Sequence, residues 1–133
     1  MNGLKGLAHI GLFINDIERS ITFYRDILGF EIIWRLDAEE PDGSITKVCF
    51  IRLGDLTIEI VQRPFQEKRS DGWVDHIAIL VENIEAAAEE LRQKGIVFET
   101  EEPVLGAGVF ANGAKWLLFR GPDGEHLEIS EIL

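Results

Sequence analysis

The stretch HIGLFINDIE at residues 9–18 returns as HIAILVENIE at residues 76–85. Four of the ten positions are identical: the His, the Ile after it, and the Ile-Glu pair at the end. Later in each copy a carboxylate interrupts an apolar run, Glu59 in TIEIV and Glu128 in HLEIS. The chain therefore contains an internal duplication, and each copy carries one His and one Glu at matched places.

Each copy predicts the same order of elements, strand-helix-strand-strand-strand. Apolar runs between turn residues predict the strands, and apolar residues at helical spacing behind a short polar cap predict the helices. In the first copy we expect strands at 7–14, 30–36, 46–53 and 56–62 and a helix over about 17–28. In the second copy we expect strands at 74–81, 97–100, 114–120 and 126–132 and a helix from Ile84 that Gly95 ends.

The predicted fold class is α+β, with two tandem βαβββ modules at 1–62 and 73–133 and a charged linker at 63–72. Neither module could bury its sheet alone at about 60 residues. We therefore expect residues 1–133 to form one domain, in which the modules pack together or exchange with a second chain. The glycine-containing segment 103–113 has two interpretations, a substrate-covering loop or an ordinary hairpin connection.

Composition narrows the class of protein. The net charge of −11 works against binding to a phosphate backbone. The apolar runs are too short to span a bilayer, and the stretch before His9 is too short for a signal-peptide core. The single cysteine, Cys49, lies in an apolar run and is expected to be a packed thiol. We predict a cytoplasmic protein with a small-molecule partner and neither a nucleic-acid nor a membrane partner.

The matched His and Glu residues predict a metal site. Strand alternation places Glu59 and Glu128 on the face opposite their apolar neighbours. An ionised carboxylate on such a strand is costly unless it is paired or bound to a metal. A lone His or Glu is ordinarily a structural or surface residue, but the duplication supplies two of each. Imidazole and carboxylate suit Ni, Co, Zn, Fe or Mn. The expected ligands are His9, Glu59, His76 and Glu128.

Several motifs resemble one known family. They are HIGL at 9–12, FYRDILGF at 23–30, DHIA at 75–78 and FRGPDGEHLE at 119–128. Together with the Glu59 strand they look like the glyoxalase I/bleomycin-resistance/extradiol-dioxygenase group, called the vicinal oxygen chelate superfamily. The resemblance implies paired βαβββ modules that form an open, barrel-like cleft, usually with a metal at its floor.

Within that superfamily the His-Glu-His-Glu set is similar to glyoxalase I. This resemblance implies a lyase or isomerase of the lactoylglutathione lyase type, which transfers a proton through a metal-stabilised enediolate. Its base would be Glu128, with Glu59 as the counterpart. Two alternatives stay open: an acyl-CoA epimerase like methylmalonyl-CoA epimerase, which usually has Gln at the Glu59 position, and a non-catalytic binding or resistance protein. The substrate would be a 2-oxoaldehyde–thiol adduct or an acyl-CoA.

Substrate contacts are expected where the chain departs from glyoxalase I. Phe13 stands where those enzymes typically have Arg, and Arg63 stands where they often have Asn. Arg63 either supplies a relocated anion contact or simply begins the linker. Trp34 and Trp116 either line the cleft or belong to the core. By the same resemblance the protein is expected to be a homodimer.

Overall fold

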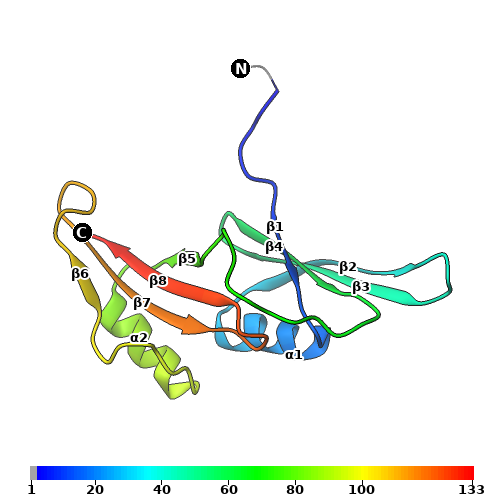
Figure 1. Cartoon of the computed structure of the whole chain (residues 1–133). Coiled ribbons are helices and arrows are strands. Elements are labelled where there is room, and N and C mark those ends of the chain that lie inside the picture. Colours follow the sequence, from blue (N-terminus) through cyan, green and yellow to red (C-terminus); the bar gives the residue numbers. More distant parts are fainter. Residues whose placement is uncertain (1–2) are drawn as a thin grey trace. The chain divides into compact units, whose positions relative to one another are not determined.

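The structure, a computed structural model, describes residues 3–133 and separates into two units (Figure 1). The first runs to Lys68 and the second spans Arg69–Leu133. This boundary falls inside the predicted linker 63–72.

The first unit has one four-stranded mixed sheet. Its strand order is β1-β4-β3-β2, with β1 parallel to β4 and the other neighbours antiparallel. Along the chain the elements are β1 (Ile10–Phe13), α1 (Ile17–Thr22), η1 (Phe23–Ile27), β2 (Glu31–Glu39), β3 (Ile45–Leu53) and β4 (Leu56–Gln62).

The second unit repeats this plan, with strand order β5-β8-β7-β6 and β5 parallel to β8. Its elements are β5 (Ile77–Leu80), α2 (Ile84–Gln93), β6 (Val104–Gly106), β7 (Ala114–Arg120) and β8 (His126–Ile132). The predicted α+β class and the duplicated βαβββ order are confirmed. Neither sheet closes on itself, and the cleft formed by both modules stays a prediction.

The two helices begin in the same way. Asp16 and Asn83 are the N-caps, and each side chain accepts a hydrogen bond from the backbone N–H three residues later. Such a cap stabilises a helix by about 1 kcal/mol. A second hydrogen bond links each helix start to the last strand of its unit. The Gln62 side chain accepts from the first N–H of α1, and the Glu131 side chain accepts from the first N–H of α2, both at 2.8 Å. Each helix start is therefore fixed to the strand that carries the predicted Glu ligand.

One face of each sheet packs on its helix. α1 contacts β3 and β4, and α2 contacts β7 and β8. On this face Ile58, Ile60, Leu127 and Ile129 are at most 2% exposed. The alternate residues Glu59 and Glu128 therefore lie on the opposite, helix-free face of each sheet.

Two predicted elements differ from the structure. The helix expected over about 17–28 changes type after Thr22: residues 23–27 form a π-helix, in which the Leu28 N–H donates to the Phe23 carbonyl at 3.3 Å. The strand expected at 97–100 is absent. Glu99 donates one backbone bond to Leu118 at 2.8 Å, but no ladder forms until β6.

Other boundaries shift by a few residues. β1 and β5 are shorter than the predicted strands 7–14 and 74–81, and β2 continues to Glu39, past the predicted end of this strand at residue 36. β6 lies inside the segment 103–113 and pairs with β7, which directly follows it. The segment therefore forms a hairpin connection. Cys49 is buried as expected, and burial raises the pKa of its thiol.

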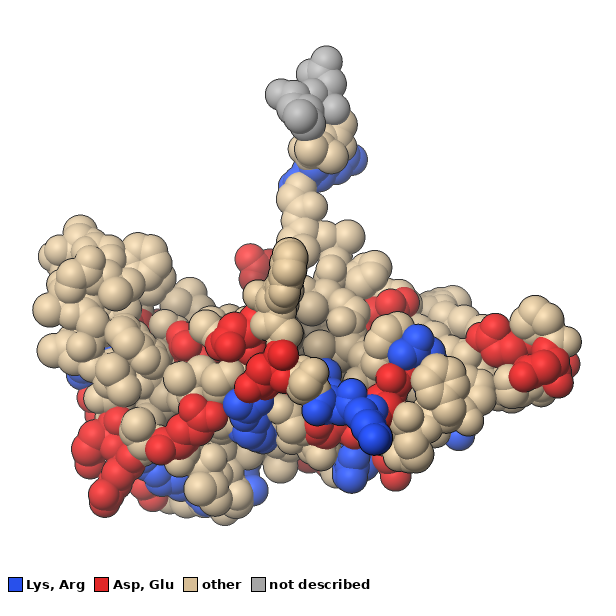
Figure 2. All heavy atoms as spheres, in the orientation of Figure 1, with Lys and Arg blue, Asp and Glu red and all other residues tan. Residues whose placement is uncertain are grey.

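The surface carries the net negative charge. On the face drawn in Figure 2, Asp and Glu side chains are spread widely, with Lys and Arg in smaller groups among them. Within residues 3–133, no helix is long and apolar enough to cross a membrane.

Candidate metal centre

The first half-site consists of His9 and Glu59. His9 directly precedes β1, and Glu59 lies on β4, the parallel neighbour of β1, in register with Gly11. The His9 Nε2 is 3.8 Å from Glu59 Oε1. The side chains are 41% and 29% exposed. The edge of the His9 ring meets Phe50, with ring centroids 5.4 Å apart.

The second half-site consists of His76 and Glu128. His76 directly precedes β5, and Glu128 lies on the neighbouring strand β8, in register with Ala78. The His76 Nε2 is 3.2 Å from Glu128 Oε2. Glu128 is only 12% exposed, and burial raises the pKa of its carboxyl group. The duplication thus places an equivalent His–Glu pair in each unit.

Two further residues surround the second half-site. The His76 Nδ1 is 2.9 Å from Asp75 Oδ2, within hydrogen-bonding geometry. The same oxygen lies 3.4 Å from Nδ1 of His126, whose ring meets His76 edge-on at 6.0 Å. Both His126 ring nitrogens are buried without a hydrogen bond, although Glu99 Oε1 is 3.0 Å from Nε2. Sequence reasoning did not select Asp75 or His126. The available signal was that Ala8 and Thr57 stand at the equivalent positions of the first copy.

The four predicted ligands occur as two pairs, one in each unit. Within residues 3–133, no three His, Cys, Asp or Glu side chains form a group that could hold a metal ion. Convergence of both pairs on one ion therefore stays a prediction.

Phe13 and Arg63 lie together on the same sheet face as the first half-site. Strand alternation puts Phe13 on the face of His9, and Arg63 is the first residue after β4. The Arg63 Cζ is 3.6 Å from the centre of the Phe13 ring. The Arg63 Nε donates to Glu67 Oε1 at 2.5 Å, which raises the pKa of Arg63 and lowers that of Glu67.

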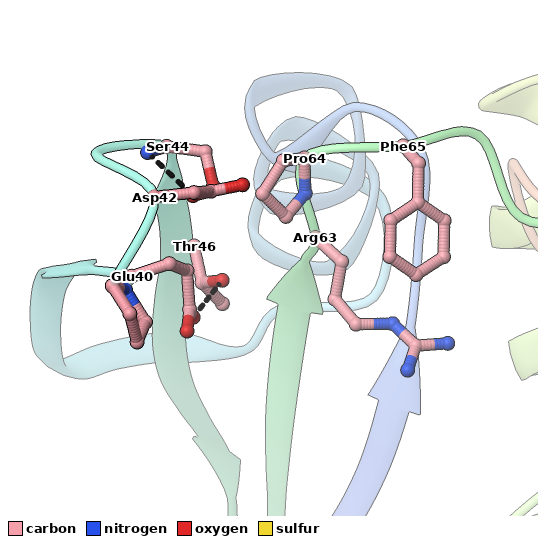
Figure 3. Close-up of a pocket in the computed structure, with 8 residues that line it drawn as sticks. Glu40, Asp42, Ser44, Thr46, Arg63, Pro64 and Phe65 are labelled. Atoms are coloured by element: carbon pink, nitrogen blue, oxygen red, sulfur yellow. Dashed lines mark hydrogen bonds between the residues drawn. The ribbon is translucent and has the colours of Figure 1, made fainter.

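A pocket of about 510 Å³ adjoins Arg63. Figure 3 shows Glu40 and Thr46 on one side of it and Arg63 with Phe65 on the other. Thr46 pairs with Ala38 on the sheet face that carries Glu59, so this pocket opens on the face of the first half-site. Arg63 follows Glu59 by four positions, or roughly 13 Å along an extended chain. The pocket is lined by Glu40, Pro41, Asp42, Ser44, Thr46, Arg63, Pro64 and Phe65.

The tryptophans also lie on these ligand-bearing faces. Trp34 on β2 is opposite Phe50, which is in turn opposite Glu59. The Trp34 residue is 66% exposed. Trp116 on β7 is opposite Ser130, on the face of Glu128. It is half-buried because its ring packs tightly against Gly106 of β6. Trp34 is therefore outside the core, whereas Trp116 supports the β6–β7 hairpin.

Comparison with known proteins decides the family. The model of the Glyoxalase/Bleomycin resistance protein/Dioxygenase superfamily matches residues 6–129. The chain belongs to this superfamily. The crystal structure of SMU.1112c matches with a TM-score of 0.77 and 28% identity over 97% of this chain and all of that one.

Similar sequences include proteins named as epimerases. The ethylmalonyl-CoA/methylmalonyl-CoA epimerase of Cereibacter sphaeroides is 34% identical over 76% of this chain and 80% of its own length. The uncharacterized protein YwbC of Bacillus subtilis is 30% identical over 93% of this chain and 95% of its own length. The mammalian methylmalonyl-CoA epimerases are 30% or 31% identical, and the match spans 61% or 62% of their length.

Proposed function

We propose that this superfamily member is a divalent-metal-dependent isomerase that moves a proton at a carbon next to a carbonyl group. His9, Glu59, His76 and Glu128 would be the ligands of one Ni, Co, Zn or Mn ion. The observation that carries the proposal is that each unit sets a His Nε2 beside a Glu carboxylate on the helix-free face of its sheet. Two such pairs, from one chain or across a homodimer, supply two nitrogen and two carboxylate donors.

The donor set fits such an ion. Imidazole nitrogen and carboxylate oxygen suit borderline divalent metals, and four protein ligands leave room for substrate oxygens in an octahedral shell. When bound, the ion would act as a Lewis acid that stabilises negative charge developing on substrate oxygens. Both Glu side chains remain partly exposed, so a substrate can approach them.

Glu128 is the proposed base. It is more buried than Glu59, and burial raises the pKa of its carboxyl group. In the metal-free chain, a carboxyl group with a raised pKa holds a proton more readily than an exposed one does. By resemblance to glyoxalase I, Glu128 would loosen from the metal when substrate binds, remove the proton from the substrate carbon and return it to the neighbouring carbon, with Glu59 as its counterpart.

The first candidate reaction is of glyoxalase I type, on an adduct of a 2-oxoaldehyde and a thiol. The His-Glu-His-Glu set favours this chemistry, because Glu59 stands where the epimerases usually have Gln. Arg63, stacked on Phe13 on the face of the first half-site, is positioned to contact an anionic group of the thiol. Trp34 and Trp116 would offer aromatic surface to the substrate.

The second candidate is epimerisation of a 2-substituted acyl-CoA, which starts with the same kind of proton removal. The specific observation in its favour is the 34% identity to the ethylmalonyl-CoA/methylmalonyl-CoA epimerase. Both candidates share the metal and the stabilised enolate. They differ in the substrate and in where the proton returns: to the neighbouring carbon in the first reaction, and to the opposite face of the same carbon in the second.

The test combines elemental analysis with two assays. Purified protein is stripped of metal and reconstituted with Ni, Co, Zn or Mn. Each form is then assayed with a methylglyoxal–glutathione hemithioacetal and with methylmalonyl-CoA. We expect metal-dependent turnover of the hemithioacetal. Turnover of methylmalonyl-CoA alone would favour the epimerase, and no metal uptake together with no turnover would contradict the enzyme and favour a binding protein.

A further inference from the structure

The two half-sites differ in the residue that precedes the His. Asp75 precedes His76, whereas Ala8 precedes His9. An alanine side chain has no hydrogen-bond acceptor, so the second half-site alone has a carboxylate at this position.

The two nitrogens of His76 face different carboxylates. The Nδ1 is 2.9 Å from Asp75 Oδ2, and the Nε2 is 3.2 Å from Glu128 Oε2. A neutral imidazole carries one proton, on one nitrogen or the other. If Nδ1–H donates to Asp75, the lone pair of Nε2 points toward Glu128 and is free to bind a metal. A proton on Nε2 would instead block that nitrogen.

His126 adjoins both Asp75 and His76. The same carboxylate oxygen is 3.4 Å from Nδ1 of the buried His126, and the His126 ring packs edge-on against His76. The Asp75 side chain, 63% exposed, thus lies between two imidazoles, and of these two rings His76 is the one within hydrogen-bonding geometry. The His126 ring is a packed neighbour of the His76 ring.

We propose that Asp75 is a positioning residue that holds His76 in the Nδ1–H tautomer and so presents Nε2 as a metal ligand. This inference rests on the proposed metal site and extends it by one residue outside the ligand set. Carboxylates that accept from the second nitrogen of a ligating His raise its basicity, and their loss typically costs about 10–100-fold in metal affinity. Ala8 cannot accept a hydrogen bond from His9 through its side chain, so His76 would be the ligand whose tautomer is fixed before the metal binds.

The test is the tautomer of His76 in metal-free protein, read from ¹⁵N chemical shifts of its ring under alkaline conditions where the imidazole is neutral. We expect Nδ1–H in the wild type. Asp75→Ala should shift His76 toward the Nε2–H form, which isolated histidine prefers, while His9 serves as an internal control with unchanged shifts. Asp75→Asn keeps a side-chain oxygen acceptor and should retain much of the Nδ1–H form.

Metal affinity supplies the second measurement. Zn²⁺ affinity, measured by competition with a chelator, should fall about 10–100-fold in Asp75→Ala and less in Asp75→Asn. Two results on metal-free protein would overturn the inference: a wild-type His76 that carries its proton on Nε2, or an Asp75→Ala variant in which the His76 shifts are unchanged. Failure of the proposed function is seen separately, as absence of Zn²⁺ binding by the wild type.

Discussion

The two half-sites share their ligands but not their surroundings. In the second, Glu128 is 12% exposed and 3.2 Å from His76, and Asp75 contacts the far nitrogen of the ring. In the first, Glu59 is 29% exposed and 3.8 Å from His9, and the same sheet face carries Arg63 and an open pocket. Under the proposed function, duplication kept the same predicted ligands in both copies, while the second copy would serve proton transfer and the first substrate binding.

The largest expected effect separates the two carboxylates. Glu128→Gln keeps the size of the side chain but removes the base, so the proton-transfer rate should fall by about 10²–10⁴-fold. The matched variant Glu59→Gln should lose less activity, because Glu59 is the more exposed counterpart. The measurement is kcat for the hemithioacetal, with metal content determined on each sample.

Metal content is the control for this comparison. If Glu128→Gln keeps its metal and its full activity, Glu128 is not the base. If Glu59→Gln loses more activity than Glu128→Gln, the proposed roles are reversed, and Glu59 would be the base.

The next effect concerns substrate binding by the first unit. Arg63→Ala removes the guanidinium that stacks on Phe13, so KM for an anionic substrate should rise by about tenfold, or ~1.4 kcal/mol, with little change in kcat. Glu67→Gln should lower KM by a small factor, because Glu67 accepts a hydrogen bond from Arg63 and competes with the substrate. Unchanged KM values in both variants would show that Arg63 only begins the linker.

The smallest expected effect is on stability. Burial raises the pKa of Glu128 above the ordinary 4.5, so the folded chain holds this proton more tightly than the unfolded chain. That stabilising contribution is fully present below about 4.5 and is lost as the pH rises through the folded pKa. At neutral pH, metal-free Glu128→Gln should therefore melt a few degrees above the wild type, and the gain should vanish in acid.

Glu59→Gln is the matched variant for the melting curves. We expect a smaller gain at neutral pH, because the Glu59 side chain is more exposed to water. Equal gains in melting temperature in both variants would show that the burial of the carboxylate does not determine the gain.

The sequence predicted most of the fold because the signals were local. Strands 56–62, 114–120 and 126–132 were predicted at their observed bounds, since apolar alternation and flanking turns mark them. The strand expected at 97–100 was wrong. A short apolar run is strand-like in sequence, but a strand also needs a partner ladder, and here that ladder forms at β6 instead.

The site was predicted only in part. Duplication identified His9, Glu59, His76 and Glu128, because matched residues can be found by aligning the chain with itself. Asp75 was missed because it has no counterpart in the first copy. The stacking of Arg63 on Phe13 joins residues 50 positions apart (13 to 63), and no local pattern shows such a contact.

Both half-sites are proposed to bind one divalent ion together. The stoichiometry and affinity of divalent metal in the wild type, His9→Ala and His76→Ala measure this directly. We expect one ion for each pair of half-sites, and a large loss of affinity in either variant. Two ions for each chain, or a variant that keeps wild-type affinity after one His is lost, would contradict it.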